Sequence, residues 1–313
     1  MPASKLGAPR QGVRLPPHRA EYEIELAPLE RDTAGAADLH GGVARNSGQA
    51  FARFFRFLNV SWVRKFLIAV VLLAAWQGLA VSMDNALLLP TASDTLKAFV
   101  QGILSGELLV KTANSLSMLM KGYALGVLCA LILTSLAVST RLGRDFLSLL
   151  TTMFNPLPSI ALLPIALLWF GLGENSILFV LVHSVLWPLA LSTFSGFQSV
   201  SPTLRMTGRN YGLGGIRLVI FVLIPAAMPA ILSGLRVGWA FAWRTAIAAE
   251  LVFGTSSGSG GLGWYIFENR NELYTDKVFA GLIAVVVIGL IIEHVVFDTL
   301  ERLTVRRWGM QQH

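Results

Sequence analysis

Three long stretches without a single Asp, Glu, Lys or Arg constrain this chain more than any other feature. They cover residues 122–140, 146–173 and 175–204. Each is close to or longer than the ~20 residues that an α-helix needs to cross a bilayer. Charged residues make up only 14% of the chain, well below the roughly 25% of a typical soluble domain. The sequence therefore predicts an integral membrane protein.

We expect an all-α membrane protein with about six transmembrane helices. The predicted spans are residues 66–81, 122–140, 146–170, 176–197, 227–253 and 278–297. An even number of spans places both termini on the same side of the membrane. About twelve Lys and Arg residues lie near span ends on that side, against about five on the other, and basic residues near span ends favour the cytoplasm. Both termini are therefore expected in the cytoplasm.

The regions outside the spans differ in composition. Residues 1–50 combine prolines, glycines and mixed charges without apolar periodicity, which predicts a disordered cytoplasmic tail. Residues 51–65 carry aromatic residues at helical spacing beside basic ones, which predicts an amphipathic helix on the membrane surface. We assign residues 66–300 to the transmembrane domain, with a polar cytoplasmic loop at 199–217, and residues 301–313 to a C-terminal cytoplasmic tail.

The formal net charge of +7 raises the question of nucleic-acid binding. Most of the basic residues lie at the ends of apolar runs, which is typical of a membrane protein in contact with lipid and not of a nucleic-acid-binding face. No phosphate loop of the form Gly-x-x-x-x-Gly-Lys-Ser/Thr occurs, so we assign no ATP hydrolysis to this chain. The five histidines show no metal-ligand spacing. We expect no catalytic site, metal or cofactor.

Prolines interrupt the middle of the chain. Pro156, Pro158 and Pro164 fall within the third predicted span, and a proline in a helix interior destabilises it by about 3 kcal/mol. In a bilayer such breaks persist where protein or a water-filled cavity satisfies the freed carbonyl groups. We interpret the three prolines as candidates for a transport path, although a plain helix kink remains an alternative for any one of them.

Three polar side chains inside predicted spans are further candidates for the path. Arg244 lies near the middle of the fifth span, where a cation costs roughly 2.5 to 3.5 kcal/mol on insertion scales. Its helical neighbours Ile247 and Ala248 are uncharged, so its partner must be another helix, another subunit or the solute. His183 either contacts a solute or hydrogen-bonds to a neighbouring helix. Glu250 is either a path residue or an ion-pair partner for Arg244 from a second subunit.

The polar loop at 199–217 has the pattern of a short helix, a turn and a second helix. Leu204, Gly208, Tyr211 and Gly212 fall on one helical stripe, and Gly212 is a natural helix stop. Met206-Thr207-Gly208, Gly212, and a Val-Leu-Ile-Pro group that ends at Pro225 follow in order.

This spacing resembles the cytoplasmic loop of binding-protein-dependent ABC importer permeases. In that family Glu-Ala-Ala is followed by glycine after three residues and then by an Ile-x-Leu-Pro-like group. Met206 stands where the acidic residue would be. The resemblance marks eight residues as the ATPase-coupling loop: Leu204, Met206, Thr207, Gly208, Tyr211, Gly212, Leu213 and Pro225.

The resemblance extends from about Leu87 to the C-terminus and is closest to the nitrate, sulfonate, taurine and bicarbonate group. It is carried by ordered motifs at residues 155–158, 161–164, 169–174, 248–251 and 256–263. The resemblance implies a type I ABC importer permease bundle in the bacterial inner membrane. It also implies docking on separate ABC ATPase subunits, pairing with a second permease subunit as a homodimer, and delivery of a small anionic solute by a periplasmic binding protein.

Two other classes of protein remain as alternatives. A secondary transporter works without an ATPase and normally carries its own coupling-ion acids within the spans, for which Glu250 and Glu293 are the candidates. A membrane-embedded enzyme would need grouped His, Asp or Ser residues on facing helices, and the sequence contains no such group.

Overall fold

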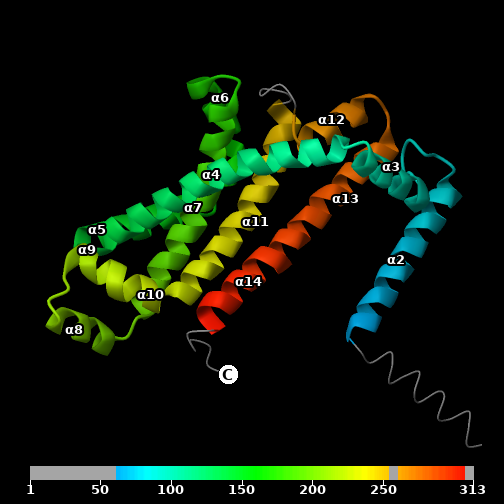
Figure 1. Cartoon of the computed structure of the whole chain (residues 1–313). Helices are drawn as coiled ribbons and strands as arrows, with labels where there is room; N and C mark the ends of the chain where they lie inside the picture. The colour runs from blue at the N-terminus through cyan, green and yellow to red at the C-terminus, as the bar shows by residue number, and fades with distance from the viewer. Residues whose placement is uncertain (1–60, 254–259, 307–313) are drawn as a thin grey trace, which may run out of the picture. The chain divides into compact units, whose positions relative to one another are not determined.

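The structure, a computed structural model, describes residues 61–253 and 260–306 (Figure 1). All the regular structure in these residues is helical, which confirms the predicted all-α class. Four helices are long and apolar enough to cross a membrane, and two bent helix pairs raise the number of candidate spans to six if each pair counts as one. Helices suit this role because their backbone hydrogen bonds are satisfied within the segment.

The four long helices include three uninterrupted ones and one that changes its winding. The uninterrupted ones are α2 (Ser61–Met83), α4 (Glu107–Val138) and α7 (Glu174–Ser199). The fourth begins as α13 (Thr275–Ile291) and continues through η3 (Ile292–Phe297), α14 (Asp298–Glu301) and η4 (Arg302–Arg306). This helix continues past residue 300, where we expected the C-terminal tail to begin.

Two predicted regions fall largely outside the described residues. The predicted tail at 1–50 lies outside them, and so does the predicted amphipathic helix except for residues 61–65, which form the first turns of α2. Residues 307–313 also lie outside.

The first bent pair corresponds to the third predicted span. Helix α5 (Arg141–Phe154) is followed by the short helix η1 (Ser159–Leu162) and α6 (Leu163–Phe170), with a bend of 91° between them. Pro156 and Pro158 lie in the break, where they cannot continue the helix. Pro164 lies in the first turn of α6, a position at which its missing N–H group has no intrahelical partner to lose.

The second bent pair leads into the fifth predicted span. It comprises α9 (Gly215–Leu218), η2 (Val219–Leu223) and α10 (Ile224–Ala226), followed after a bend of 79° by α11 (Met228–Phe253). Proline residues 225 and 229 flank this bend, and each removes a backbone donor from the helix.

Three further helices lie beside the ends of the long ones: α3 (Ala92–Leu104), α8 (Pro202–Asn210) and α12 (Leu262–Asn271). Figure 1 shows α8 near the lower ends of α7 and α11, and α6 and α12 near their upper ends.

Helix α7 is the centre of the packing. In its most apolar stretch 56% of the residues are buried, against 6% in α2. Small residues allow close approach: a Cβ atom on Gly122 or Gly126 of α4 would lie within 2.7 Å of Leu181 or Val185 of α7. The path of the chain therefore places α7 between α4 and α11, with α2 at the edge.

Candidate functional site

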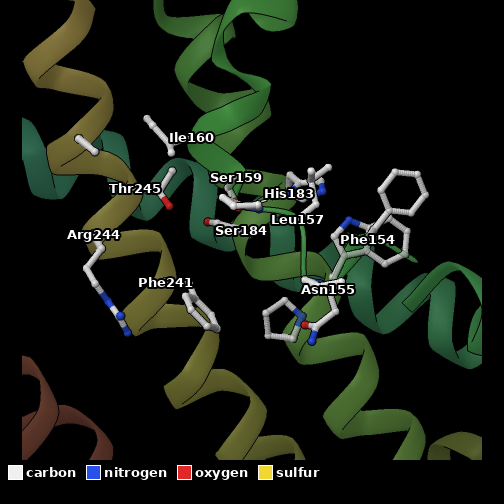
Figure 2. A pocket seen from close by; sticks show the side chains of 15 residues that line it. Phe154, Asn155, Leu157, Ser159, Ile160, His183, Ser184, Phe241, Arg244 and Thr245 are labelled. Carbon is white, nitrogen blue, oxygen red and sulfur yellow. Dashed lines mark hydrogen bonds between the residues drawn. The ribbon is translucent and has the colours of Figure 1, made fainter. Parts of the chain in front are cut away.

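A cavity of about 540 Å³ lies where the break between α5 and η1 meets α7 and α11 (Figure 2). Its lining residues are Phe154, Asn155, Pro156, Leu157, Pro158, Ser159, Ile160, His183, Ser184, Trp187, Pro188, Phe241, Arg244, Thr245 and Ala248. The proline-rich break provides one wall because it leaves the chain in a non-helical path for several residues. Figure 2 shows His183 and Ser184 on α7, and Phe241, Arg244 and Thr245 on α11.

An aromatic cluster forms the wall on the α5 and α7 side. The rings of Phe154 and Trp187 stack with centroids 4.9 Å apart, and Phe154 meets the imidazole of His183 edge-on at 6.2 Å. Nδ1 of His183 lies 3.2 Å from Oγ of Ser159, which joins α7 to η1. His183 thus contacts a neighbouring helix and also lines the cavity.

Arg244 is the one charged residue among those that line the cavity. Its side chain is exposed, with Nε donating to the carbonyl oxygen of Ala240 at 2.9 Å and the guanidinium lying 5.1 Å from the ring centroid of Phe241. No carboxylate within the described ranges forms an ion pair with it. Most of its donor groups are therefore available to another molecule.

The polar side chains around the cavity comprise donor-only groups, the imidazole of His183, and four residues that can both donate and accept, namely Asn155, Ser159, Ser184 and Thr245. Nε1 of Trp187 and Nε2 of His183 are both buried and have no hydrogen-bond partner in the described structure. A tryptophan N–H and an arginine guanidinium can only donate. No Asp or Glu lines the cavity. The arrangement is chemically suited to a group that accepts hydrogen bonds and carries negative charge.

The structure brings together four of the six residues that we considered for the path: Pro156, Pro158, His183 and Arg244. Pro164 and Glu250 do not line the cavity. Sequence reasoning missed its aromatic members, Phe154, Trp187 and Phe241. The available signals were their places, next to the proline-rich break, beside Pro188 and one turn before Arg244.

Glu250 instead holds the polypeptide that leads into α12. Its carboxylate accepts hydrogen bonds from Oγ of Ser115 on α4 at 2.7 Å and from the backbone N–H of Gly263 at 2.8 Å. The N–H of Leu262 in turn donates to Oγ of Ser115 at 2.8 Å. A Cβ atom on Gly261 would lie only 2.4 Å from the carboxylate oxygens. Glycine is therefore required where the backbone passes this buried acid.

Arg236 and the end of the last long helix form a separate ionic cluster. The guanidinium of Arg236 lies 3.2 Å from Glu293, 3.0 Å from Asp298 and 3.4 Å from Glu301. His294 lies 3.3 Å from Asp298 in the same cluster.

The predicted coupling loop folds as a helix, a glycine turn and a second helix. Ser201 caps α8 by accepting a hydrogen bond from the N–H of Leu204, and the N–H groups of Gly212 and Leu213 donate back to Arg209 and Gly208 at 2.9 and 3.1 Å. Gly212 has φ of +76°, so the predicted helix stop is confirmed.

The loop residues divide into a buried and an exposed set. Gly208 is buried, and a Cβ atom there would lie 2.7 Å from Leu218 and 3.0 Å from Val222. Leu204 is 42% exposed, Met206 62% and Tyr211 82%. Thr207 Oγ1 donates to the carbonyl oxygen of Thr203, Leu213 is half-buried, and Pro225 lies in the first turn of α10. Of the eight residues, Leu204, Met206 and Tyr211 therefore present apolar side chains to the outside of the single chain.

Comparison with known proteins decides the family. The model of the family described as "binding-protein-dependent transport system inner membrane component" matches residues 122–307, more than half of the chain. The chain belongs to this family. Members of the binding-protein-dependent transport family are membrane components of transport systems and not enzymes, which agrees with the resemblance seen in the sequence.

Three relatives within this transport family cover most of the chain. A putative aliphatic sulfonates transport permease of Escherichia coli (strain K12) is 31% identical over 252 residues, 80% of this chain and 94% of that protein. A taurine transport system permease of the same organism is 29% identical over 236 residues, 72% and 82% of the two chains. A putative ABC transporter permease of Methanocaldococcus jannaschii is 32% identical over 235 residues, 74% and 87%.

Proposed function

We propose that this chain is the permease subunit of an ATP-driven ABC importer and forms the translocation path for a small anionic solute. Sulfonates, taurine, nitrate and related anions are the solutes that relatives and resemblance favour. The observation that carries the charge preference is the cavity between α5, α7 and α11, where Arg244 is accompanied by no carboxylate.

The cavity chemistry supports a transient site for an anion. Arg244 from α11, together with Trp187 and His183 from α7, lines the cavity, and the exposed guanidinium forms no ion pair with a carboxylate of the described residues. Most of the remaining lining is aromatic or apolar, so an anion would be held by few polar contacts. Weak holding suits a path, because the solute must also leave it.

The chain carries no phosphate loop, so ATP hydrolysis belongs to a separate ABC ATPase subunit. We assign residues 199–217 to the contact with that subunit. The exposed apolar residues of α8 and its turn favour a protein contact, and the ordered glycine stop gives α8 a fixed end. In this assignment α8 faces the cytoplasm, and so do both termini.

Three further partners complete the proposed assembly. A second permease subunit, most simply another copy of this chain, would close the other side of the path. A periplasmic binding protein would deliver the solute on the opposite face of the inner membrane. Membrane lipid would cover α2, whose most apolar stretch is almost wholly exposed in the single chain.

The secondary transporter alternative is weakened by the positions of the two acids that it requires. Glu250 accepts hydrogen bonds from Ser115 and Gly263, and Glu293 is paired with Arg236. Neither carboxylate lines the cavity. Coupling to an ion gradient would need an acid that can exchange its partner with the transported ion.

Purification of the tagged chain from its native membranes tests the assembly. We expect a complex of two permease and two ATPase subunits by native mass spectrometry, with the ATPase recognised by its phosphate-loop peptide. Recovery of this chain alone, with solute transport retained, would contradict the proposal.

A further inference from the structure

Helix α7 ends without a glycine to close it. Its last residue is Ser199, and the next residue, Val200, is already extended with ψ of 126°. The last carbonyl groups of a helix need donors from elsewhere in the structure. The hydroxyl of Ser199 donates to the carbonyl oxygen of Gly196 and the N–H of Val200 to that of Phe197, and the side chain of Arg205 from the following helix adds further donors.

Arg205 reaches back from α8 with two donor groups. Its Nη2 donates to the carbonyl oxygen of Phe197 in α7, and its Nε donates to the carbonyl oxygen of Val200 at 3.3 Å. A cation at a helix C-terminus also interacts favourably with the helix dipole. Because the guanidinium is planar and rigid, two bonds fix the orientation of α8 relative to the end of α7.

The other arginines of the loop are differently placed. Arg209 and Arg217 are exposed and form no ion pair with the described residues. Arg205 is half-buried. Arg205 is therefore the arginine of this loop that serves an internal contact, while the other two face outward.

Helix α8 has a second attachment at Gly208, which lies directly against Leu218 and Val222. That attachment leads to α11 only through the 79° bend between α10 and α11. The attachment through Arg205 instead leads straight into α7, which carries His183 and Trp187 of the cavity. The two routes from α8 to the cavity therefore differ: one crosses a bend between two helices, and the other runs along the single helix α7, which contains Pro188.

We propose that Arg205 is a positioning residue that makes α8 and α7 move together, so that a displacement of α8 reaches the cavity wall at His183 and Trp187. This role rests on the proposed function, in which the ATPase moves α8. A lysine at this position carries the charge on a single ammonium group and cannot reproduce the two-pronged contact. Glutamine lacks the charge and the reach.

The first experiment measures the attachment itself in the full-length chain, without any ATPase. Spin labels at Leu191→Cys on α7 and Met206→Cys on α8, in a Cys129→Ala background, report the distance between the two helices; both positions are exposed. We expect Arg205→Gln to broaden the distance distribution, and the matched control Arg209→Gln to leave it unchanged. An unchanged distribution in Arg205→Gln would overturn the proposal.

The second experiment measures coupling in proteoliposomes that contain the assembled transporter. The readout is solute molecules imported per ATP hydrolysed, normalised to the amount of complex. We expect Arg205→Gln to lower this ratio at least about fivefold, the lower end of typical coupling between sites. Arg205→Lys should retain an intermediate ratio, and the control Arg141→Gln, at an exposed arginine of α5 outside the loop, should retain the wild-type ratio.

The outcomes separate this inference from the proposed function. A helix cap that only stabilises the fold would reduce the amount of complex and leave the import-to-ATP ratio of the remaining complex unchanged, and that result would overturn the proposal. Failure of any ATPase to assemble with the wild-type chain would instead contradict the proposed function. In that case the spin-label distances still decide whether Arg205 joins the two helices.

Discussion

The hydroxyl of Ser115 donates a hydrogen bond of 2.7 Å to the carboxylate of Glu250, joining α4 to α11 across 135 residues of sequence. The same carboxylate receives the N–H of Gly263 at the start of α12. One buried acid thus fixes three helices at the end of the molecule opposite to α8.

Glu250→Ala is expected to loosen α12 and lower the stability of the protein. The substitution leaves the Ser115 hydroxyl and the Gly263 N–H without their acceptor. A buried polar group left unsatisfied lowers the free energy of unfolding by about 1–3 kcal/mol. Glu250→Gln keeps an acceptor oxygen and should have a smaller effect. Thermal unfolding in detergent, with hydrogen exchange of residues 260–271, checks both. Equal stability of the Ala variant and the wild type would contradict the anchoring role.

The proposed topology predicts which positions react with a membrane-impermeant thiol reagent added outside cells. In a Cys129→Ala background, Ser105→Cys should be labelled and Ser201→Cys should not. Ser105 precedes the start of α4 and Ser201 follows the end of α7, and the proposed topology places these two helix ends on opposite sides of the membrane. Both side chains are exposed in the structure, so accessibility is set by the membrane side. External labelling of Ser201→Cys would place α8 outside the cell and contradict the orientation.

Two glycines of the loop should be sensitive to valine for different reasons. Gly212→Val introduces a β-branched side chain at φ of +76° with nothing within 4 Å, so its effect is backbone strain of about 1–3 kcal/mol. Gly208→Val instead collides with Leu218 and Val222. Both variants should insert into the membrane and lose solute-stimulated ATP hydrolysis. Gly212→Asn, which tolerates this backbone region better, should restore activity, and wild-type activity in both valine variants would count against the loop's role.

Substitution of Arg244 separates a solute contact from a structural one. If the guanidinium meets the anion, Arg244→Gln should lower import at least about tenfold with a normal amount of complex, because a charge-assisted hydrogen bond worth about 1.5–3 kcal/mol is lost. Arg244→Lys keeps the charge and should retain more import. If Arg244 instead pairs with an acid of a second subunit, both variants should reduce assembly, with the larger loss in Gln. Normal import by a stable Gln variant would refute the path role.

The sequence predicts the helical class, most helix positions and the stop at Gly212, because apolar stretches, prolines and glycines act through local backbone chemistry. It also singles out Arg244, since a cation within an apolar stretch needs an explanation. It does not predict that Phe154 stacks on Trp187, because aromatic residues in membrane helices also face lipid. The contact of Arg205 with carbonyl groups of Phe197 and Val200 was equally hidden, because every residue carries a carbonyl and the acceptor has no sequence signature.

The placement of Glu250 shows the same limit. Its position within a predicted span made it a candidate for the path, whereas its partners Ser115 and Gly263 come from other helices and are ordinary residues in sequence. Only the fold brings a hydroxyl and a glycine N–H to that carboxylate.

Uptake into proteoliposomes tests the central claim most directly. The chain, its ATPase partner and its binding protein would be combined with a labelled alkanesulfonate, taurine or nitrate, with ATP supplied on the side of the ATPase. We predict that uptake of at least one of these anions requires ATP hydrolysis, is absent with a non-hydrolysable ATP analogue, and is not driven by a proton or sodium gradient alone. Gradient-driven uptake by this chain without an ATPase would contradict the account.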